Sequence, residues 1–224
     1  NIALHCVPLD LAPVLRDDLF GRVESAVITS ATLATDDGFD FVERRLGIDD
    51  LKMPRMSAVF PSPFDYPHQA LLVIPTDLPA PNENARGHLD AVGAQLRDLM
   101  IASDGGLFAL FTSHRDLRDM AEQLRQSGYD ARWPLLVHGE EPRDVLLQRF
   151  RDSGRAVLLG TATFWEGVDV PGDALRGLLI AKLPFRVPSE PMVAAQCEAI
   201  EARGGNAFGE FMLPHASLRL KQGF

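Results

Sequence analysis

The residue types best suited to chemistry gather in one segment of this 224-residue chain, residues 161–172. It reads Thr-Ala-Thr-Phe-Trp-Glu-Gly-Val-Asp-Val-Pro-Gly. Its threonine hydroxyls can donate to phosphate oxygens, and the carboxylates of Glu166 and Asp169 can accept charge-assisted hydrogen bonds. Gly167 and Gly172 permit backbone angles that other residues avoid. An ordinary connection rarely combines these features, so the segment predicts a functional loop.

Two shorter segments also place hydroxyl side chains after apolar residues. Thr112 and Ser113 follow one apolar run, and Ser30 and Thr32 follow another. Such hydroxyls can hold phosphate oxygens together with the free amides at the start of a following helix. For Thr112 and Ser113 a helix N-cap is the competing interpretation, and both can hold because a helix N-terminus is also an anion site. For Ser30 and Thr32 the alternative is a plain turn.

A parallel sheet is the element that could bring these segments together. Strand-like and helix-like segments alternate from residue 85 onward, which predicts βαβ units and an α/β fold. We expect strands at residues 106–111, 135–137, 156–160 and 177–182, and helices at 85–102, 115–127, 142–151 and about 190–203. Further strands are expected at 23–29 and 70–74, and a helix at 39–46. In such a sheet, the loops after the strands collect the ligand-binding groups.

The composition is that of a globular protein, with 46% apolar and 24% charged residues. No apolar run approaches the roughly 20 residues of a membrane-spanning helix, and no secretion signal is visible. Cys6 and Cys197 are too few for a disulfide framework, a zinc site or a four-cysteine cluster, so we expect a cytoplasmic protein. A net charge of −9 by itself argues against nucleic-acid binding. The chain begins without Met, so we expect an excised segment.

Residues 161–172 closely resemble motif V of the DinG/XPD branch of superfamily 2 helicases, with Thr163 where that family normally has serine. The family's other motifs are matched in the same order, by residues 30–32 (motif III), 110–113 (motif IV), 183–191 (the segment after motif V) and 222–224 (the start of motif VI). The resemblance covers nearly the whole chain. It implies a RecA-like parallel sheet flanked by helices, the second helicase motor domain, in residues 66–224. Residues 1–65 would be the end of the first motor domain and a linker.

The resemblance also implies roles for individual residues. The implied catalytic residues are Glu166, Asp169 and Gln222. The implied nucleotide-binding residues are Gly167, Asp169 and Gln222. Contacts to the DNA backbone fall to Thr112, Ser113, Thr161, Thr163 and Arg186. Ser30 and Thr32 would couple the nucleotide state to the grip on DNA. No metal site is expected in the chain.

The implied cofactors are ATP and Mg²⁺, held mainly by the first motor domain. The chain has neither a Gly-rich phosphate loop nor an Asp-Glu-Ala-His box, so we expect it to be inactive alone. An iron–sulfur cluster is an option for the parent protein only. The implied partners are single-stranded or forked DNA and a replication or repair protein, with no membrane, and the implied polarity is five-prime to three-prime.

Two other function classes stay open from the sequence. The chain could be a non-catalytic interaction module derived from such a helicase, which an exposed apolar patch would favour. It could also be an unrelated Rossmann-like enzyme, such as a nucleotide-sugar transferase. That enzyme would need a Gly-x-Gly-x-x-Gly fingerprint, and neither glycine pair, at 105–106 or 204–205, has this spacing.

Overall fold

The computed structural model describes residues 8–35, 38–165 and 167–223, and the chain forms two compact units. The first unit joins the N-terminal segment, up to Asp65, with Phe185–Gln222. The second unit comprises Tyr66–Pro184 together with Gly223. The assignment of residues 1–65 and 66–224 to two motor domains stays a prediction. Glu166, one of the predicted catalytic residues, lies outside the described residues.

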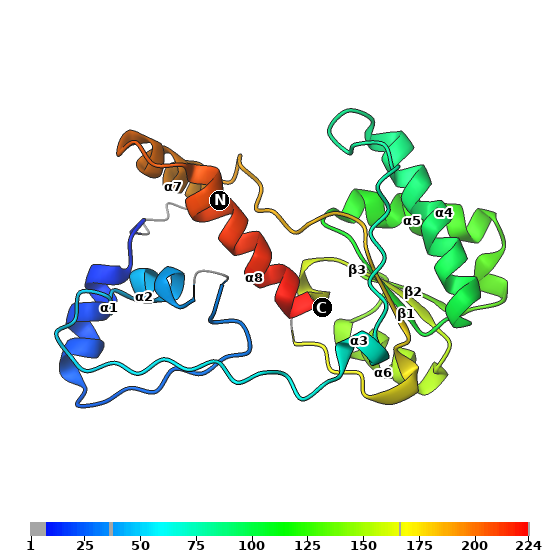
Figure 1. Cartoon of the computed structure of the whole chain (residues 1–224). Helices are drawn as coiled ribbons and strands as arrows, with labels where there is room; N and C mark the ends of the chain where they lie inside the picture. The colour runs from blue at the N-terminus through cyan, green and yellow to red at the C-terminus, as the bar shows by residue number, and fades with distance from the viewer. Residues whose placement is uncertain (1–7, 36–37, 166, 224) are drawn as a thin grey trace. The chain divides into compact units, whose positions relative to one another are not determined.

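Four parallel strands form the centre of the second unit (Figure 1). They are β1 (Leu107–Leu110), β2 (Leu135–Val137), β3 (Val157–Gly160) and β4 (Gly177–Ile180), in the order β2-β3-β1-β4. All four strands were predicted, with bounds within two residues of those observed. The predicted class, a parallel sheet flanked by helices, is confirmed. The strands lack polar alternation because both faces of the sheet are covered.

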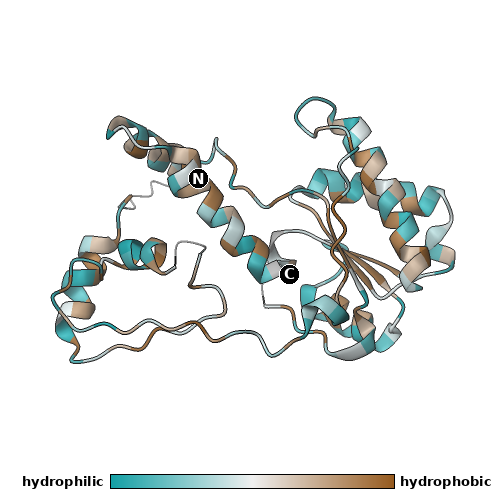
Figure 2. Cartoon of the chain, viewed as in Figure 1, coloured by the Kyte–Doolittle hydropathy of each residue, from teal (hydrophilic) through white to brown (hydrophobic). Residues whose placement is uncertain are grey.

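Helices cover the two faces of this sheet and confine ligands to its edges. On one face lie α4 (Ala85–Ser103) and α5 (His114–Gln126), whose apolar side chains share a buried cluster with Leu107 and Ala109 of β1. The opposite face is covered by α6 (Arg143–Ser153), where the Phe150 ring lies 4.5 Å from that of Phe108. Figure 2 shows the strands as apolar ribbons between helices with hydrophilic outer surfaces. The loops at the carboxyl ends of the strands are therefore where ligand-binding groups are expected.

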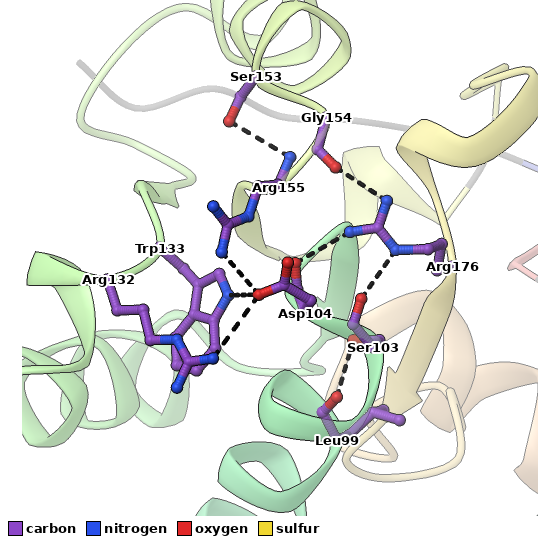
Figure 3. Close-up of polar contacts among 9 residues, drawn as sticks. All are labelled: Leu99, Ser103, Asp104, Arg132, Trp133, Ser153, Gly154, Arg155 and Arg176. Carbon is purple, nitrogen blue, oxygen red and sulfur yellow. Dashed lines mark hydrogen bonds and ion pairs between the residues drawn. The ribbon is translucent and has the colours of Figure 1, made fainter.

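The amino-terminal edge of the sheet is closed by a polar network around Asp104 (Figure 3). The Asp104 carboxylate accepts hydrogen bonds from Arg155 Nη2 at 2.7 Å and from Trp133 Nε1 at 3.2 Å. The bond from Arg155, and then that from Trp133, lowers the pKa of Asp104. The Arg176 guanidinium donates to the backbone oxygens of Ser103, Asp104, Gly154 and Asp173. These residues precede the four strands, so the network ties all the incoming connections together.

The first unit is helical in its described part. Its longer helices are α1 (Ala12–Asp18), α2 (Asp40–Leu46), α7 (Pro191–Ala202) and α8 (Leu213–Gly223). Short turns complete the chain: η1 (Phe20–Arg22) and the π-helical turn η5 (Phe208–Met212) here, and α3 (Tyr66–Gln69), η2 (Tyr129–Ala131), η3 (Ala162–Phe164) and η4 (Gly172–Ala174) in the second unit. The sequence predicted α2 and α7 but missed α1 and α8. No helix in the described stretches has the length and apolar content needed to cross a membrane.

Two predicted strands are wrong. Neither residues 23–29 nor residues 70–74 form a strand, and their apolar side chains are open to solvent. Val27 and Leu71 are each 89% exposed. The residue types favour a strand, but a strand also needs a neighbour to accept and donate its backbone hydrogen bonds. In the described part of the chain, neither segment has such a neighbour.

Candidate nucleic-acid interface

Two of the predicted loops leave the sheet side by side. β1 and β3 are hydrogen-bonded neighbours, and Leu110 and Gly160 are partners at their last positions. The Phe111 amide donates to the Gly160 oxygen at 2.8 Å, and Trp165 Nε1 donates to the Phe111 oxygen at 3.4 Å. Trp165 is buried, so it packs beneath the loop. The structure therefore brings the segments at 111–114 and 161–165 to the same edge of the sheet.

Ser113 caps helix α5 at this edge. Its Oγ accepts hydrogen bonds from the amides of Arg115 at 3.2 Å and Asp116 at 3.1 Å, so the N-cap interpretation holds. The hydroxyl proton of Ser113 is still available for donation, since accepting uses only the oxygen lone pairs. Thr112 precedes it with an exposed side chain. Lys182, just beyond β4, pairs with Asp116 at 2.7 Å and so joins the end of that strand to α5.

Thr161 connects two histidines at the same edge. Its Oγ1 lies 2.8 Å from His138 Nδ1 and 3.2 Å from His114 Nε2, and the residue is only 2% exposed. Thr163 Oγ1 lies 3.5 Å from His138 Nε2, at the limit of a hydrogen bond. A hydroxyl has one proton, so Thr161 donates to one imidazole and accepts from the other. This arrangement fixes the orientation of both rings.

The pKa of His138 is lowered from its ordinary value. Burial is the largest cause, followed by the charges of His114 and Arg143. The ring is therefore neutral at neutral pH, with one nitrogen donating and the other accepting. The edge thus presents hydroxyl and imidazole groups that can donate hydrogen bonds without a permanent positive charge at His138.

Two arginines of α6 hold the backbone of the segment that resembles motif V. Arg143 donates from Nε to the Thr163 oxygen at 3.1 Å and from Nη2 to the Gly167 oxygen at 2.9 Å. Arg151 Nη2 donates to the Asp169 oxygen at 2.7 Å. Gly167 has a φ of +63°, which favours glycine. The side chain of Asp169 is exposed while its backbone is held, so the carboxylate is available to a ligand.

Four of the other predicted residues lie in the first unit. Gln222 Nε2 donates to Thr32 Oγ1 at 3.2 Å, and Thr32 Oγ1 lies 3.3 Å from Ser30 Oγ. Ser30 and Thr32 were expected to couple the nucleotide state to DNA binding, and Gln222 stands at the start of the segment that resembles motif VI. The structure brings these three residues together. Arg186 belongs to this unit as well, whereas Thr112 and the other predicted DNA contacts belong to the second unit.

The sequence analysis missed His114, His138, Arg143 and Arg151. His138 had a usable signal, because it follows β2 directly, just as Thr161 follows β3. The rule that strand ends collect functional groups would have included it. The arginines had no comparable signal, since they bind backbone oxygens that are distant in sequence.

Residues 96–224 match the family model described as the helicase C-terminal domain. The chain is 40% identical over 223 residues to the ATP-dependent DNA helicase YoaA of Escherichia coli K12, covering 100% of the chain and 34% of that protein. It is 37% identical over 219 residues to the ATP-dependent DNA helicase DinG of Photobacterium profundum, covering 96% of the chain and 31% of that protein.

The chain is also 35% identical over 225 residues to a Bacillus subtilis protein named 3'-5' exonuclease DinG. That match covers 99% of the chain and 24% of the relative. The chain thus spans about a third or less of the length of the curated relatives it matches.

We predict that the His138 ring titrates below about 6.5, the ordinary histidine value. Because the unfolded chain then binds more protons in this window, unfolding free energy should fall as pH drops from about 6.5 toward the folded pKa. NMR titration of the imidazole protons and urea unfolding at several pH values measure both effects. His138→Gln should reduce this pH dependence. A His138 pKa at or above 6.5 would contradict the description of the site.

Proposed function

Because the chain belongs to the helicase C-terminal domain family, we propose that it is the second motor lobe of an ATP-dependent DNA helicase. The resemblance to DinG-like helicases that the motifs predicted is confirmed by this membership and by the matches over the whole chain. In the proposed activity, ATP hydrolysis drives movement along a single strand and the unwinding of duplex DNA. Two of the relatives are named ATP-dependent DNA helicases, which supports this proposal.

The observation that supports it best is the pairing of β1 with β3. This pairing places the start of α5 beside the loop that begins at Thr161. In the proposed complex, a phosphate of the strand accepts hydrogen bonds from the exposed hydroxyls of Thr112 and Thr163, from Ser113 and from the positive end of α5. Thr161 is buried and engaged with two imidazoles, so its proposed role is to orient them toward the strand.

An acidic chain can bind DNA in this way because neutral donors and helix amides replace lysine and arginine. The chain has a net charge of −9, Lys182 at this edge is paired with Asp116, and Arg143 donates to the backbone oxygens of Thr163 and Gly167. Neutral contacts release few counterions, so binding should be weak and only moderately dependent on salt. A grip of this kind suits a motor that must release the strand in every cycle.

ATP is proposed to contact the segment around Asp169. The Asp169 carboxylate is exposed on a backbone that Arg151 holds, so it can accept from a ribose hydroxyl or an arginine of motif VI. Gly167 would allow close approach of the nucleotide, and Glu166, outside the described residues, would act beside it. The hydrogen bond from Gln222 to Thr32 would couple the nucleotide state to Thr32.

The resemblance places Mg²⁺ mainly in the first motor domain and allows an iron–sulfur cluster in the parent protein. In the part that the structure describes, no group of three or more His, Cys, Asp or Glu side chains could hold a metal ion. The resemblance alone extends the proposal to five-prime to three-prime movement on single-stranded or forked DNA, in cytoplasmic repair or replication.

A non-catalytic interaction module is the second candidate, and exposed apolar side chains favour it. In the first unit Met56 is 97% exposed and Phe60 is 88% exposed. In the second unit Leu71 and Ile74 are 89% and 71% exposed. Such unpaired apolar segments can join the sheet edge of another protein or domain. This candidate does not require any DNA contact from Ser113, so the following experiment separates the two.

Ser113→Asp should separate helix capping from DNA binding. Aspartate caps a helix as well as serine does, and its charge is favourable at a helix N-terminus, so the melting temperature should be unchanged or slightly raised. The same charge repels a phosphate, so affinity for a labelled oligothymidylate should fall by about tenfold or more, equivalent to about 1.4 kcal/mol. Fluorescence anisotropy at low salt measures the affinity, and calorimetry the melting temperature.

Ser127→Asp is the matched control, because Ser127 is the exposed C-cap at the other end of the same helix. It makes the same change in net charge and should alter affinity by less than about twofold. Equal losses in both variants, or no loss in Ser113→Asp, would remove the start of α5 from the DNA interface.

Asp169→Asn tests the nucleotide side in the full-length helicase. The substitution keeps the size of the side chain but removes its charge, so DNA-stimulated ATP hydrolysis should fall by about a hundredfold with little change in melting temperature. Asp173→Asn, an exposed position in the same connection, is the control and should keep nearly full activity. Wild-type rates for Asp169→Asn would refute its proposed contact with nucleotide or arginine.

A further inference from the structure

The first unit contains a cavity of about 570 Å³ whose wall is rich in arginine. Its lining residues come from α1, α2, α7 and the segments beside them, all within this unit. The arginines in the wall are Arg16, Arg44, Arg45, Arg186 and Arg203. A concave surface with several guanidinium groups is suited to a compact anion.

The arginines of the wall differ in whether a carboxylate balances their charge. Arg16 Nη1 lies 3.4 Å from an Asp50 oxygen, and Arg203 Nη2 lies 2.6 Å from a Glu210 oxygen. Within the described residues, neither Arg45 nor Arg186 has a carboxylate at ion-pairing distance. Arg45 and Arg186 thus carry guanidinium charges that no described carboxylate pairs with, while Asp10 and Asp49 also line the cavity.

His215 stands beside these two arginines and is kept neutral. Its Nε2 lies 2.6 Å from Arg45 Nη1, and the neutral ring accepts that hydrogen bond. Burial, followed by the charges of Arg45 and Arg186, lowers the pKa of His215 to about 4. The Phe41 and Phe211 rings pack on the imidazole with centroid distances of 5.5 and 4.7 Å. The Arg45 guanidinium is thus held in place by an uncharged partner.

We propose that Arg45 and Arg186 bind a phosphate group in this cavity, as a second contact to the DNA strand in the first unit. Guanidinium groups present planar pairs of N–H donors that match two phosphate oxygens, and an anion between them would neutralise the unbalanced charge. The assignment to a DNA phosphate rests on the proposed function. The binding of a phosphate group as such does not.

Inorganic phosphate is the first probe, and the His215 ring is its reporter. In the wild-type chain, the imidazole resonances of His215 should shift saturably with phosphate at constant ionic strength set by chloride. Arg45→Gln and Arg186→Gln should each weaken this response by about tenfold. Arg203→Gln removes an arginine of the same cavity that is already paired with Glu210. The phosphate affinity of this variant should stay within about twofold of the wild-type value. No saturable shift in the wild type, or equal losses in Arg203→Gln, would overturn the proposal.

Labelled oligothymidylate and ATP are the second and third probes, and they identify the source of the phosphate. If a DNA phosphate occupies the site, Arg186→Gln should lower oligonucleotide affinity by about fivefold to tenfold. It should also reduce the slope of log affinity against log salt by about 0.7, the value for one contact to a single strand. Competition with phosphate by ATP but not by the oligonucleotide would overturn the assignment to DNA.

The outcomes separate this site from the proposed function. If the chain binds no oligonucleotide at all, the proposed function fails, while phosphate titration of His215 still decides whether the site exists. If Ser113→Asp weakens DNA binding but the arginine variants do not, the function stands and this site is refuted. Should the glutamine variants unfold, Arg45→Lys and Arg186→Lys keep the charge but lose the paired donors, and should still lower affinity by about threefold.

Discussion

The parallel pairing of β1 with β3 is the constraint on which the candidate interface depends. Leu110 and Gly160 are register partners, so the chains that leave them start from neighbouring points on the same edge of the sheet. A shift in register or an antiparallel pairing would send the two loops to different heights or opposite edges. The hydroxyls of Thr112 and Thr163 therefore share one surface because of backbone hydrogen bonds buried in the sheet.

The polar groups at the two edges of this sheet differ in whether they are bonded within the protein or available to a ligand. At the amino-terminal edge, the charged groups of Asp104 and Arg176 form hydrogen bonds within the protein: Asp104 with the Arg155 side chain, and Arg176 with a backbone oxygen. At the carboxyl-terminal edge, polar groups such as Thr163 and Ser113 keep hydrogen-bonding capacity for a ligand. Helices cover both faces of the sheet, so binding groups collect at the ends of its strands, and the Asp104 network occupies the amino-terminal ends.

Sequence reasoning predicted the sheet well because its signals are local. Each strand is a short apolar run between turn residues, and the hydroxyls of Thr112 and Thr161 directly follow two of these runs. The strands predicted at 23–29 and 70–74 have the same residue types but no neighbour in the described chain, and pairing is not a local property. For the same reason the sequence could not reveal that His138 and His114 share the hydroxyl of Thr161.

The central claim is that the carboxyl-terminal edge of the sheet receives a nucleic-acid phosphate. The most direct test is backbone amide NMR of the chain during titration with oligothymidylate. The largest shifts should fall at residues 112–116 and 161–165, where the start of α5 meets the neighbouring loop. Shifts confined to the opposite edge, around Gly105, Gly106 and Arg155, would contradict the account.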